Sequence, residues 1–311
     1  MKSRDSGPSK LVSFVTNAKM ASLVGVKYRL HGCMGKLRAQ YLYPVKEFNQ
    51  NELASIAGQI EAISRETGRW MKEQTHVHEG NAETKTTNNL VTVVDKESER
   101  RFVEALKKIV PEAGFVAEEG TGEKSASGLN WVIDPLDGTT NFVHGVPVWC
   151  TSVALCAGPI PLAGVIFDPS SDECYTAYQN GGARMNGNII QVSDIVRLDQ
   201  SLLATGFPYD DFGREQQYIA LFRELMRNTR GMRRLGSAAL DMAWTAIGRF
   251  EGFYEYGLNP WDVAAGTIII REAGGTVTEF DGGNDPIFGE DLICTNGKIH
   301  QQMMDVVGRF F

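Results

Sequence analysis

The chain has 311 residues, 42% of them hydrophobic, and carries 31 Lys or Arg against 38 Asp or Glu. This composition is ordinary for a soluble globular enzyme and excludes collagen-like, coiled-coil and wholly disordered proteins. The five cysteines, at positions 33, 150, 156, 174 and 294, are too few and too scattered for a disulfide framework or a C-x-x-C zinc site. We therefore expect a protein of a reducing compartment, the cytoplasm.

The net charge of −7 is distributed unevenly along the chain. Residues 1–44 hold eight Lys or Arg and one Asp, a net charge of +7, which leaves −14 for the rest. An acidic body is a poor general binder of nucleic acid and suits an enzyme that binds cations. We expect residues 1–44 to be a disordered basic leader; a targeting segment, a translated upstream leader and a cloning remnant all fit it. No apolar core followed by a cleavage site marks a secretory signal.

Residues 146–167 carry no charge over 22 positions and are long enough to suggest a membrane span. The cluster Gly158-Pro159-Ile160-Pro161 lies in the middle of this stretch. A helix interrupted in this way would leave backbone groups unpaired in lipid. Two buried strands joined by a turn explain the same residues better, so we expect no membrane association.

The predicted elements begin with an amphipathic helix over residues 50–74, in which apolar residues recur at helical spacing. A short strand over 90–94 leads to a second helix capped near Asp95. Strands follow, and then Asn186-Gly187 indicates a hairpin. The strands are 130–133, 148–157, 162–168 and 173–178; after residue 200 come helices 211–228, 237–248, 260–273 and 298–309, with strands 252–255, 276–279 and 291–294. This order favours a layered α/β (α+β) sandwich in two halves, 45–195 and 196–311.

The segment from Trp131 to Phe142 is the most informative part of the chain. An apolar strand runs into Asp134, and Asp137-Gly138 then turns the chain toward a helix that Thr139 or Thr140 can cap. Two carboxylates and the Leu136 carbonyl form a hard-oxygen site suited to Mg²⁺. The helix start is suited to an anion. A cation site beside a phosphate site indicates metal-assisted phosphoryl chemistry.

Two further acidic segments add to this pattern. Glu118-Glu119 follows the apolar run 114–117, as if a second strand end delivered carboxylates to the same sheet edge. In the segment 259–266, Asn259 suits a helix cap and Asp262 falls in the first helical turn. Each alone is explained by a solvated turn or a helix cap. With the first segment they favour one acidic site that the C-terminal half completes.

The segments Asp134-Pro-Leu-Asp-Gly-Thr-Thr-Asn-Phe142 and Trp261-Asp-Val-Ala-Ala-Gly266 resemble the two signature motifs of the inositol monophosphatases. The intervening order of residues also resembles that family over about residues 50–310. The resemblance implies a five-layer αβαβα sandwich, a homodimer, and Mg²⁺-dependent, Li⁺-sensitive hydrolysis of phosphate monoesters. One departure is that Lys85 lies ten residues before Asp95, where the family pattern has about one residue more.

The resemblance also implies roles for single residues. Glu118, Asp134 and the Leu136 carbonyl would hold a first Mg²⁺, Asp134, Asp137 and Asp262 a second, and a third would bind near Glu118. Asp95 and Thr139, together with Glu118, would orient and activate the attacking water. The Gly138 and Thr139 amides would bind phosphate, Glu255 would contact sugar-alcohol hydroxyls, and Arg233, Ser237 and Ala238 would line the substrate pocket.

This reading needs no Ser, Cys or His nucleophile, because a metal-activated water attacks phosphorus directly. The pair His76 and His78 has no third zinc ligand, and we read both as incidental. The leading substrate is myo-inositol monophosphate, since Thr140-Asn141-Phe142 differs from the motif ending of the related nucleotide phosphatases. Two alternatives stay open: a fructose-1,6-bisphosphatase or broad sugar-phosphate phosphatase, and a non-enzymatic binding or regulatory protein.

Overall fold

The computed structural model describes residues 46–74, 82–86, 89–125, 127–208 and 212–311, together with strands β1 (Tyr28–Arg29) and β2 (Gln40–Tyr41), which pair antiparallel. The expectations for the rest of the leader, for His76 and His78, and for the side chain of Lys85 lie outside the described part. Residues 48–311 form one compact unit. The description below concerns the unit 48–311.

A seven-stranded sheet has the order β11-β10-β9-β8-β7-β6-β5. Only β5 and β6 run parallel; the other neighbours are antiparallel. Five apolar or alternating runs give the longer strands predicted from the sequence. The strands are β5 (Gly114–Ala117), β6 (Leu129–Asp137), β7 (Cys150–Ala157), β8 (Ile160–Asp168), β9 (Glu173–Tyr178), β10 (Ala183–Met185) and β11 (Asn188–Ile189).

The hairpin between β10 and β11 is confirmed at Asn186-Gly187. Both residues have positive φ, 49° and 81°, as a two-residue hairpin of type I′ requires. The uncharged stretch 146–167 forms most of β7 and β8, joined by a turn at Gly158, as expected. No helix among the residues described is both long and apolar enough to cross a membrane.

A five-stranded sheet has the order β13-β12-β14-β16-β15. Strand β12 is parallel to both of its neighbours, and β16 is antiparallel to its own. The short strands β12 and β13 were not predicted from the sequence. The strands are β12 (Leu202–Thr205), β13 (Gly231–Arg233), β14 (Gly252–Tyr256), β15 (Thr276–Thr278) and β16 (Asp291–Thr295).

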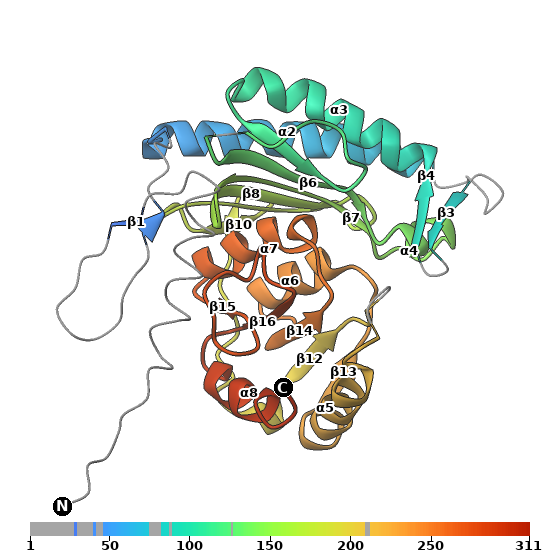
Figure 1. Cartoon of the computed structure of the whole chain (residues 1–311), viewed down its shortest axis with the longest axis vertical. Coiled ribbons are helices and arrows are strands. Elements are labelled where there is room, and N and C mark those ends of the chain that lie inside the picture. The colour runs from blue at the N-terminus through green and yellow to red at the C-terminus, as the bar shows by residue number, and fades with distance from the viewer. Residues whose placement is uncertain are drawn as a thin grey trace, which may run out of the picture. The chain divides into compact units, whose positions relative to one another are not determined.

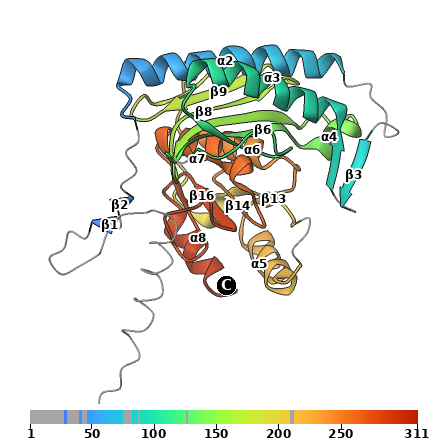
Figure 2. The same cartoon turned by 45° about the horizontal axis from the view of Figure 1, so that its top comes forward.

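Helices separate and cover the two sheets (Figure 1). Helices α2 (Gln50–Glu73) and α3 (Val93–Ile109) lie on the outer face of the large sheet; α6 (Ala238–Ala246) and α7 (Pro260–Glu272) fill the space between the sheets; and α5 (Glu215–Asn228) and α8 (His300–Val307) cover the far face of the small sheet. Figure 2 shows the same layers after a turn of 45°. The predicted αβαβα sandwich is therefore confirmed.

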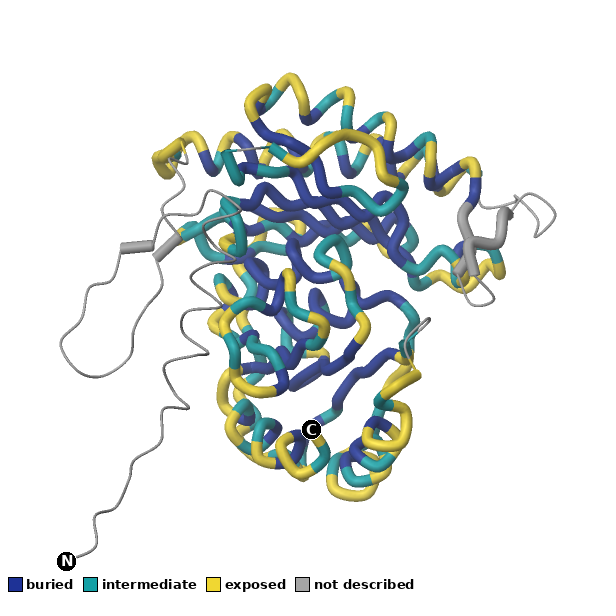
Figure 3. Tube along the Cα trace, in the orientation of Figure 1, coloured by how far each residue is buried: buried dark blue, intermediate teal, exposed yellow. Residues whose placement is uncertain are grey.

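The largest apolar core lies between the sheets and is built mainly from α6, α7 and the strands that they touch. Figure 3 shows the strands and these two helices as the buried part, with the outer helices half exposed. Two glycines allow the layers to pack closely. A Cβ on Gly266 of α7 would lie 2.7 Å from Met242 of α6, and a Cβ on Gly164 of β8 would lie 2.7 Å from Ile268 of α7. Substitution at either glycine would push the layers apart. The core thus holds α7 firmly against both neighbours.

Two small elements complete the region of the predicted site. Strands β3 (Ala82–Thr86) and β4 (Asn89–Thr92) form an antiparallel pair, and α4 (Thr139–Val143) is a single short helix after β6. Helix α3 begins directly after β4 and is capped by Thr92, so Asp95 is not the cap but the third helical residue. The expected cap position was therefore off by three residues, because Thr92 and Asp95 form a reciprocal capping box.

Candidate active site

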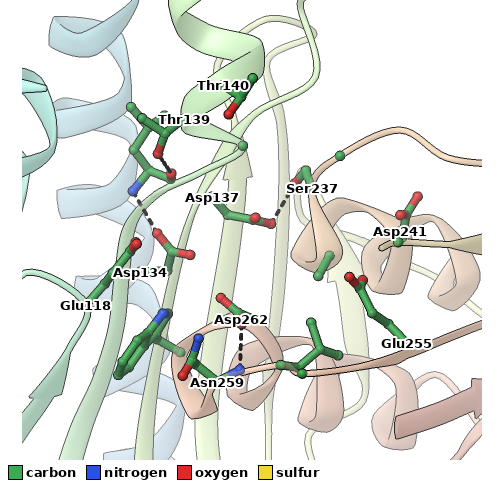
Figure 4. A pocket seen from close by; sticks show the side chains of 18 of the residues that line it. Glu118, Asp134, Asp137, Thr139, Thr140, Ser237, Asp241, Glu255, Asn259 and Asp262 are labelled. Carbon is green, nitrogen blue, oxygen red and sulfur yellow. Dashed lines mark hydrogen bonds between the residues drawn. The ribbon is translucent and has the colours of Figure 1, made fainter. Parts of the chain in front are cut away.

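Asp134 and Asp137 lie at the carboxyl end of β6. In a regular strand, residues three apart point to opposite faces of the sheet. Here β6 carries one extra residue against β7, because Asp134 pairs with Ser152 whereas Asp137 pairs with Cys150. A bulge of this kind bends the strand and re-aims a side chain, and Pro135, which has no N–H, falls within it. Both carboxylates therefore reach one pocket, as Figure 4 shows.

Backbone and hydroxyl donors hold these two carboxylates. Asp134 Oδ1 accepts a hydrogen bond of 2.9 Å from the Leu136 N–H. Asp137 Oδ2 accepts from the Ser237 hydroxyl at 2.6 Å and from the Ala239 N–H at 2.7 Å. Ser237 also caps α6. The end of β6 is thus tied to the start of α6, and the two halves of the sequence share one acidic site.

Glu118 follows β5 and lines the same pocket. Its backbone N–H donates to the Ile133 carbonyl at 3.3 Å, so the chain stays beside β6 past the end of the strand. The next turn is fixed from α3, where the buried Glu99 carboxylate accepts from the N–H groups of Glu119 at 2.7 Å and Thr121 at 2.8 Å. Of the two acids predicted here, the structure brings Glu118 to the pocket wall, while Glu119 is not among its described lining residues.

Asp262 enters the pocket from the N-terminus of α7. The Asn259 N–H donates to Asp262 Oδ2 at 2.7 Å in a capping box, and Pro260 occupies the first helical turn. The Ser152 hydroxyl donates to the Trp261 carbonyl at 3.1 Å, which joins this turn to β7. With the tight packing at Gly266, these contacts fix the carboxylate opposite Asp137 (Figure 4).

Asp95 and Thr139 form a second, adjoining unit. The Thr139 hydroxyl lies 3.0 Å from Asp95 Oδ1 and 3.0 Å from the Leu136 carbonyl oxygen. Asp95 is 1% exposed and accepts through Oδ2 from the Thr92 N–H and hydroxyl. Asp95 does not itself line the pocket; it reaches the pocket through Thr139. Gly138, with φ of 91°, makes the turn from β6 into α4, and a Cβ there would lie 2.8 Å from the Val148 carbonyl oxygen.

The pocket collects acids from distant parts of the sequence. Its lining includes acids that follow or lie on β5, β6, α6, β14 and α7, and one described cation, Arg234. Figure 4 shows Glu118 and Asp134 on one side, Asp137 and Asp262 between, and Asp241 and Glu255 on the other side. The lining residues are Glu118, Asp134, Leu136, Asp137, Gly138, Thr139, Thr140, Gly206, Arg234, Gly236, Ser237, Ala238, Asp241, Glu255, Gly257, Leu258, Asn259, Trp261 and Asp262.

The electrostatics of these acids follow from burial and like charge. Burial raises the pKa of Asp134 well above its usual range, and the charges of Glu118, Asp137 and Asp262 raise it further. Burial, and then Asp137, likewise raise the pKa of Asp262. Burial raises the pKa of Asp137 less far, because the Ser237 hydroxyl stabilises its charged form. The protein's own groups therefore leave this negative charge poorly compensated.

As the side chains stand, no three His, Cys, Asp or Glu residues of the described chain are grouped so that they could hold a metal ion. The chemistry of the donors is nonetheless that of a hard cation, since the pocket offers carboxylate oxygens and one backbone carbonyl from Leu136. The four described cysteines, Cys150, Cys156, Cys174 and Cys294, are buried free thiols.

The pocket contains most of the residues expected on its substrate side. Ser237, Ala238, Gly138 and Glu255 all line it. Arg233 does not: it lies exposed on β13, and its guanidinium donates to the Met232 carbonyl. Its neighbour Arg234 lines the pocket instead, because adjacent residues in an extended chain point to opposite sides.

Among the lining residues that were not predicted as site residues are Arg234, Gly206 and Asp241. A signal existed for Asp241, which is the one charged residue in the helix Ala238–Ala246. A single aspartate in an otherwise apolar, buried helix is unusual unless something binds it. Gly206 had no comparable signal, because the strand β12 before it was not recognised.

Comparison with known proteins agrees with this geometry. The model of the inositol monophosphatase family matches residues 49–308. The inositol-1-monophosphatase of Rhizobium meliloti is 41% identical over 220 residues, 70% of this chain and 83% of that protein. The Nus factor SuhB of Pasteurella multocida is 38% identical over 224 residues, 72% of this chain and 84% of that protein.

A solved structure of an inositol monophosphatase from Anabaena superposes with a TM-score of 0.74 at 35% identity, covering 83% of this chain and 97% of that one. The family match, residues 49–308, spans both sheets and all the acids of the pocket. The chain belongs to the inositol monophosphatase family.

Proposed function

We propose that this protein is a Mg²⁺-dependent phosphomonoesterase that hydrolyses myo-inositol monophosphate to inositol and phosphate. Membership of the family supports a phosphatase of this type. One observation carries the proposal furthest: Glu118, Asp134, Asp137 and Asp262, from three separate segments, line one pocket beside Gly138 and Thr139. Nothing in the packing of the fold requires four acids at one place.

The donor set fits Mg²⁺. Glu118, Asp134 and the Leu136 carbonyl would hold one ion, Asp134, Asp137 and Asp262 a second, and a third would bind near Glu118; all of these groups are oxygen donors. Bound there, Mg²⁺ would supply charge neutralisation for the phosphoryl group and the leaving alkoxide. It would also offset the repulsion between carboxylates that, after burial, raises the pKa of Asp134.

In this proposal, Asp95 and Thr139 handle the proton of the attacking water. The Thr139 hydroxyl donates one hydrogen and retains lone pairs, and Asp95 Oδ1 lies 3.0 Å away as its acceptor. A water that donates to the Thr139 oxygen is thereby oriented. The Asp95 carboxylate, on the other side of Thr139, stabilises the positive charge that develops as the water gives up its proton. Glu118, on the neighbouring strand end, would assist from the other side, and the Gly138 and Thr139 amides would bind the phosphate oxygens.

The Mg²⁺ requirement and the substrate are tested by phosphate release from inositol 1-phosphate, fructose 1,6-bisphosphate, a 3′-phosphoadenosine nucleotide and glycerol phosphate, with and without Mg²⁺. We expect a Mg²⁺-dependent preference for inositol 1-phosphate, and inhibition by Li⁺. Preference for the bisphosphate would move the protein to the sugar-bisphosphatase alternative. If the folded protein with Mg²⁺ released phosphate from none of these substrates, the enzymatic proposal would be contradicted and a non-enzymatic role favoured, such as that of a Nus factor, the name of the Pasteurella relative.

The homodimer and the cytoplasmic location expected from the sequence are part of the same proposal. A dimer is tested by sedimentation of the full chain at micromolar concentration. The location is tested by fractionation of the cell that makes it. A stable monomer, or recovery with the membrane or the secreted fraction, would contradict these two points and leave the chemistry of the pocket untouched.

A further inference from the structure

The side of the pocket away from Glu118 and Asp134 contains a second pair of acids that the metal roles do not use. Asp241 projects from α6 and Glu255 from β14, and both line the pocket. Figure 4 shows them together beyond Asp137 and Asp262. Asp241 is 1% exposed and Glu255 is 6% exposed. Burial raises the pKa of both carboxyls; the charge of Asp241 then raises that of Glu255 further, and the charge of Asp137 raises that of Asp241.

Asp241 is the unexplained member of this pair. Its Oδ1 is buried and has no hydrogen-bond partner among the residues described. The remainder of its helix is apolar apart from Thr245, whose hydroxyl bonds to the Asp241 backbone carbonyl rather than to the carboxyl. Buried polar oxygens without partners are rare in folded proteins, and in a pocket they indicate a ligand group. Packing of α6 gives no reason for an aspartate here.

The backbone makes room for the other member. A Cβ on Gly206 would lie 2.0 Å from Glu255 Oε2 and 2.1 Å from its carboxyl carbon and Oε1. The Glu255 carboxyl thus rests directly over the backbone of Gly206, at the end of β12. Any side chain at position 206 would displace it. Gly206, Asp241 and Glu255 together form one wall of the pocket.

The one described cation of the lining stands at the edge of this wall. The Arg234 guanidinium lies 5.5 Å from the centre of the Phe207 ring, and its charge acts on both Asp241 and Glu255. Arg234 itself is exposed. A partly solvated cation offsets two buried acids only in part, so the wall presents net negative character and hydrogen-bond acceptors to a ligand.

We propose that Asp241 is a specificity-determining residue that binds a hydroxyl of the leaving group, and that with Glu255 it selects uncharged polyols over leaving groups that carry a second phosphate. The inference rests on the proposed phosphatase function and names the substrate class of that same site. A hydroxyl both donates and accepts, so it satisfies a carboxyl oxygen that lacks a partner. A second phosphate would instead bring like charge against two acids in a desolvated wall.

Two variants separate the hydroxyl contact from the charge. Asp241→Leu removes the acceptor at similar volume, and we expect kcat/KM for inositol 1-phosphate to fall about tenfold relative to p-nitrophenyl phosphate, whose leaving group has no neighbouring hydroxyl. Asp241→Asn keeps an acceptor and removes the charge. We expect it to raise the ratio of fructose 1,6-bisphosphate to inositol 1-phosphate hydrolysis about tenfold.

The matched control is Thr267→Val. Thr267 lies on α7, and its buried hydroxyl also has no partner among the described residues, but it does not line the pocket. The Thr267→Val variant should leave both ratios, inositol 1-phosphate to p-nitrophenyl phosphate and fructose 1,6-bisphosphate to inositol 1-phosphate, within twofold of the wild type. Unchanged ratios in folded Asp241 variants would overturn the proposal, because a purely structural aspartate would affect all substrates alike.

A measurement on the wild type covers the case in which the Asp241 variants do not fold. Among monodeoxy analogues of inositol 1-phosphate, removal of either of two different hydroxyls should each lower kcat/KM about tenfold, one for Asp241 and one for Glu255. Sensitivity to one hydroxyl or to none would overturn the proposal. Failure of the wild type on every phosphate ester would instead contradict the proposed function itself.

Discussion

The Ser237 hydroxyl donates a hydrogen bond of 2.6 Å to Asp137 Oδ2, and the two residues are 100 positions apart in the sequence. The same hydroxyl accepts from the Leu240 N–H at 3.3 Å and so caps α6. One oxygen atom therefore joins the carboxyl end of strand β6 to the helix that lies between the sheets. This bond makes the orientation of a proposed metal ligand depend on the docking of α6.

Ser237→Ala should weaken both functions of that hydroxyl. We expect the free energy of unfolding to fall by about 1–3 kcal/mol, from the lost cap and the lost bond to a carboxylate. We also expect the Mg²⁺ concentration for half-maximal activity to rise, because Asp137 is less well oriented. Urea unfolding and a Mg²⁺ titration of activity measure the two effects. Ser237→Thr keeps a hydroxyl and is the control; equal behaviour of Ala and Thr would contradict the role assigned to the bond.

Asp137→Asn should abolish turnover while preserving the fold. The change keeps the shape of the side chain and removes the negative charge of a carboxylate that, in the proposal, binds a metal ion. Because burial raises the pKa of this group, the variant should be at least as stable as the wild type in the absence of Mg²⁺. Phosphate release and thermal unfolding test both points. Normal hydrolysis by the variant at saturating Mg²⁺ would remove Asp137 from the metal site.

The sequence predicted the acids of the first motif because their local pattern is complete: a buried strand, Pro135, and the turn at Gly138. It could not show how Asp134 and Asp137 come to face the same way, since that depends on a bulge defined by the register of β6 against β7. A register is a relation between two strands, and a one-residue slip inverts every side chain. The motif therefore located the site, and only the pairing explains its geometry.

The substrate side was predicted less well for the same kind of reason. Arg233 and Arg234 are adjacent, and the strand β13 that decides which one faces the pocket has three residues and no sequence signature. Asp241 carried a signal, as a lone charge in an apolar helix, but its position at the pocket depends on the packing of α6 between two sheets. Long, periodic elements were predicted from the sequence, whereas short parallel strands and the walls that they form were not.

Without Mg²⁺, the stability of the protein should fall as the pH rises above 3.8, the ordinary pKa of an aspartate. Burial, and then the nearby carboxylates, raise the pKa values of Asp134 and Asp262 in the folded protein. The folded state therefore binds more protons than the unfolded state over this range. Each such proton lowers the free energy of unfolding by about 1.4 kcal/mol per pH unit. Saturating Mg²⁺ should remove this part of the slope.

The comparison with and without Mg²⁺ isolates the pocket. Burial lowers the pKa of His300, whose ring nitrogens lie 3.1 Å and 3.0 Å from the hydroxyls of Thr278 and Thr295, and this gives a slope of opposite sign below pH 6.5. His300 does not line the pocket, so its contribution is the same in both conditions. Urea unfolding at a series of pH values gives the slopes. Identical slopes with EDTA and with Mg²⁺ would contradict the coupling of these acids to the ion.

Gly206→Ala should impair recognition of the leaving group without harming the fold as a whole. The new Cβ would lie about 2 Å from the Glu255 carboxyl, which must move away from its place over the backbone. We expect the KM for inositol 1-phosphate to rise about tenfold, the equivalent of one lost hydrogen bond to a carboxylate.

Gly58→Ala on α2 is the matched control, since nothing lies within 4 Å of its Cβ position. That change should leave KM unaltered and stabilise the helix by about 1 kcal/mol, because alanine is the better helix former. An unchanged KM in Gly206→Ala would show that the Glu255 carboxyl can bind the substrate from another position, and that the close approach of Gly206 is a matter of packing alone.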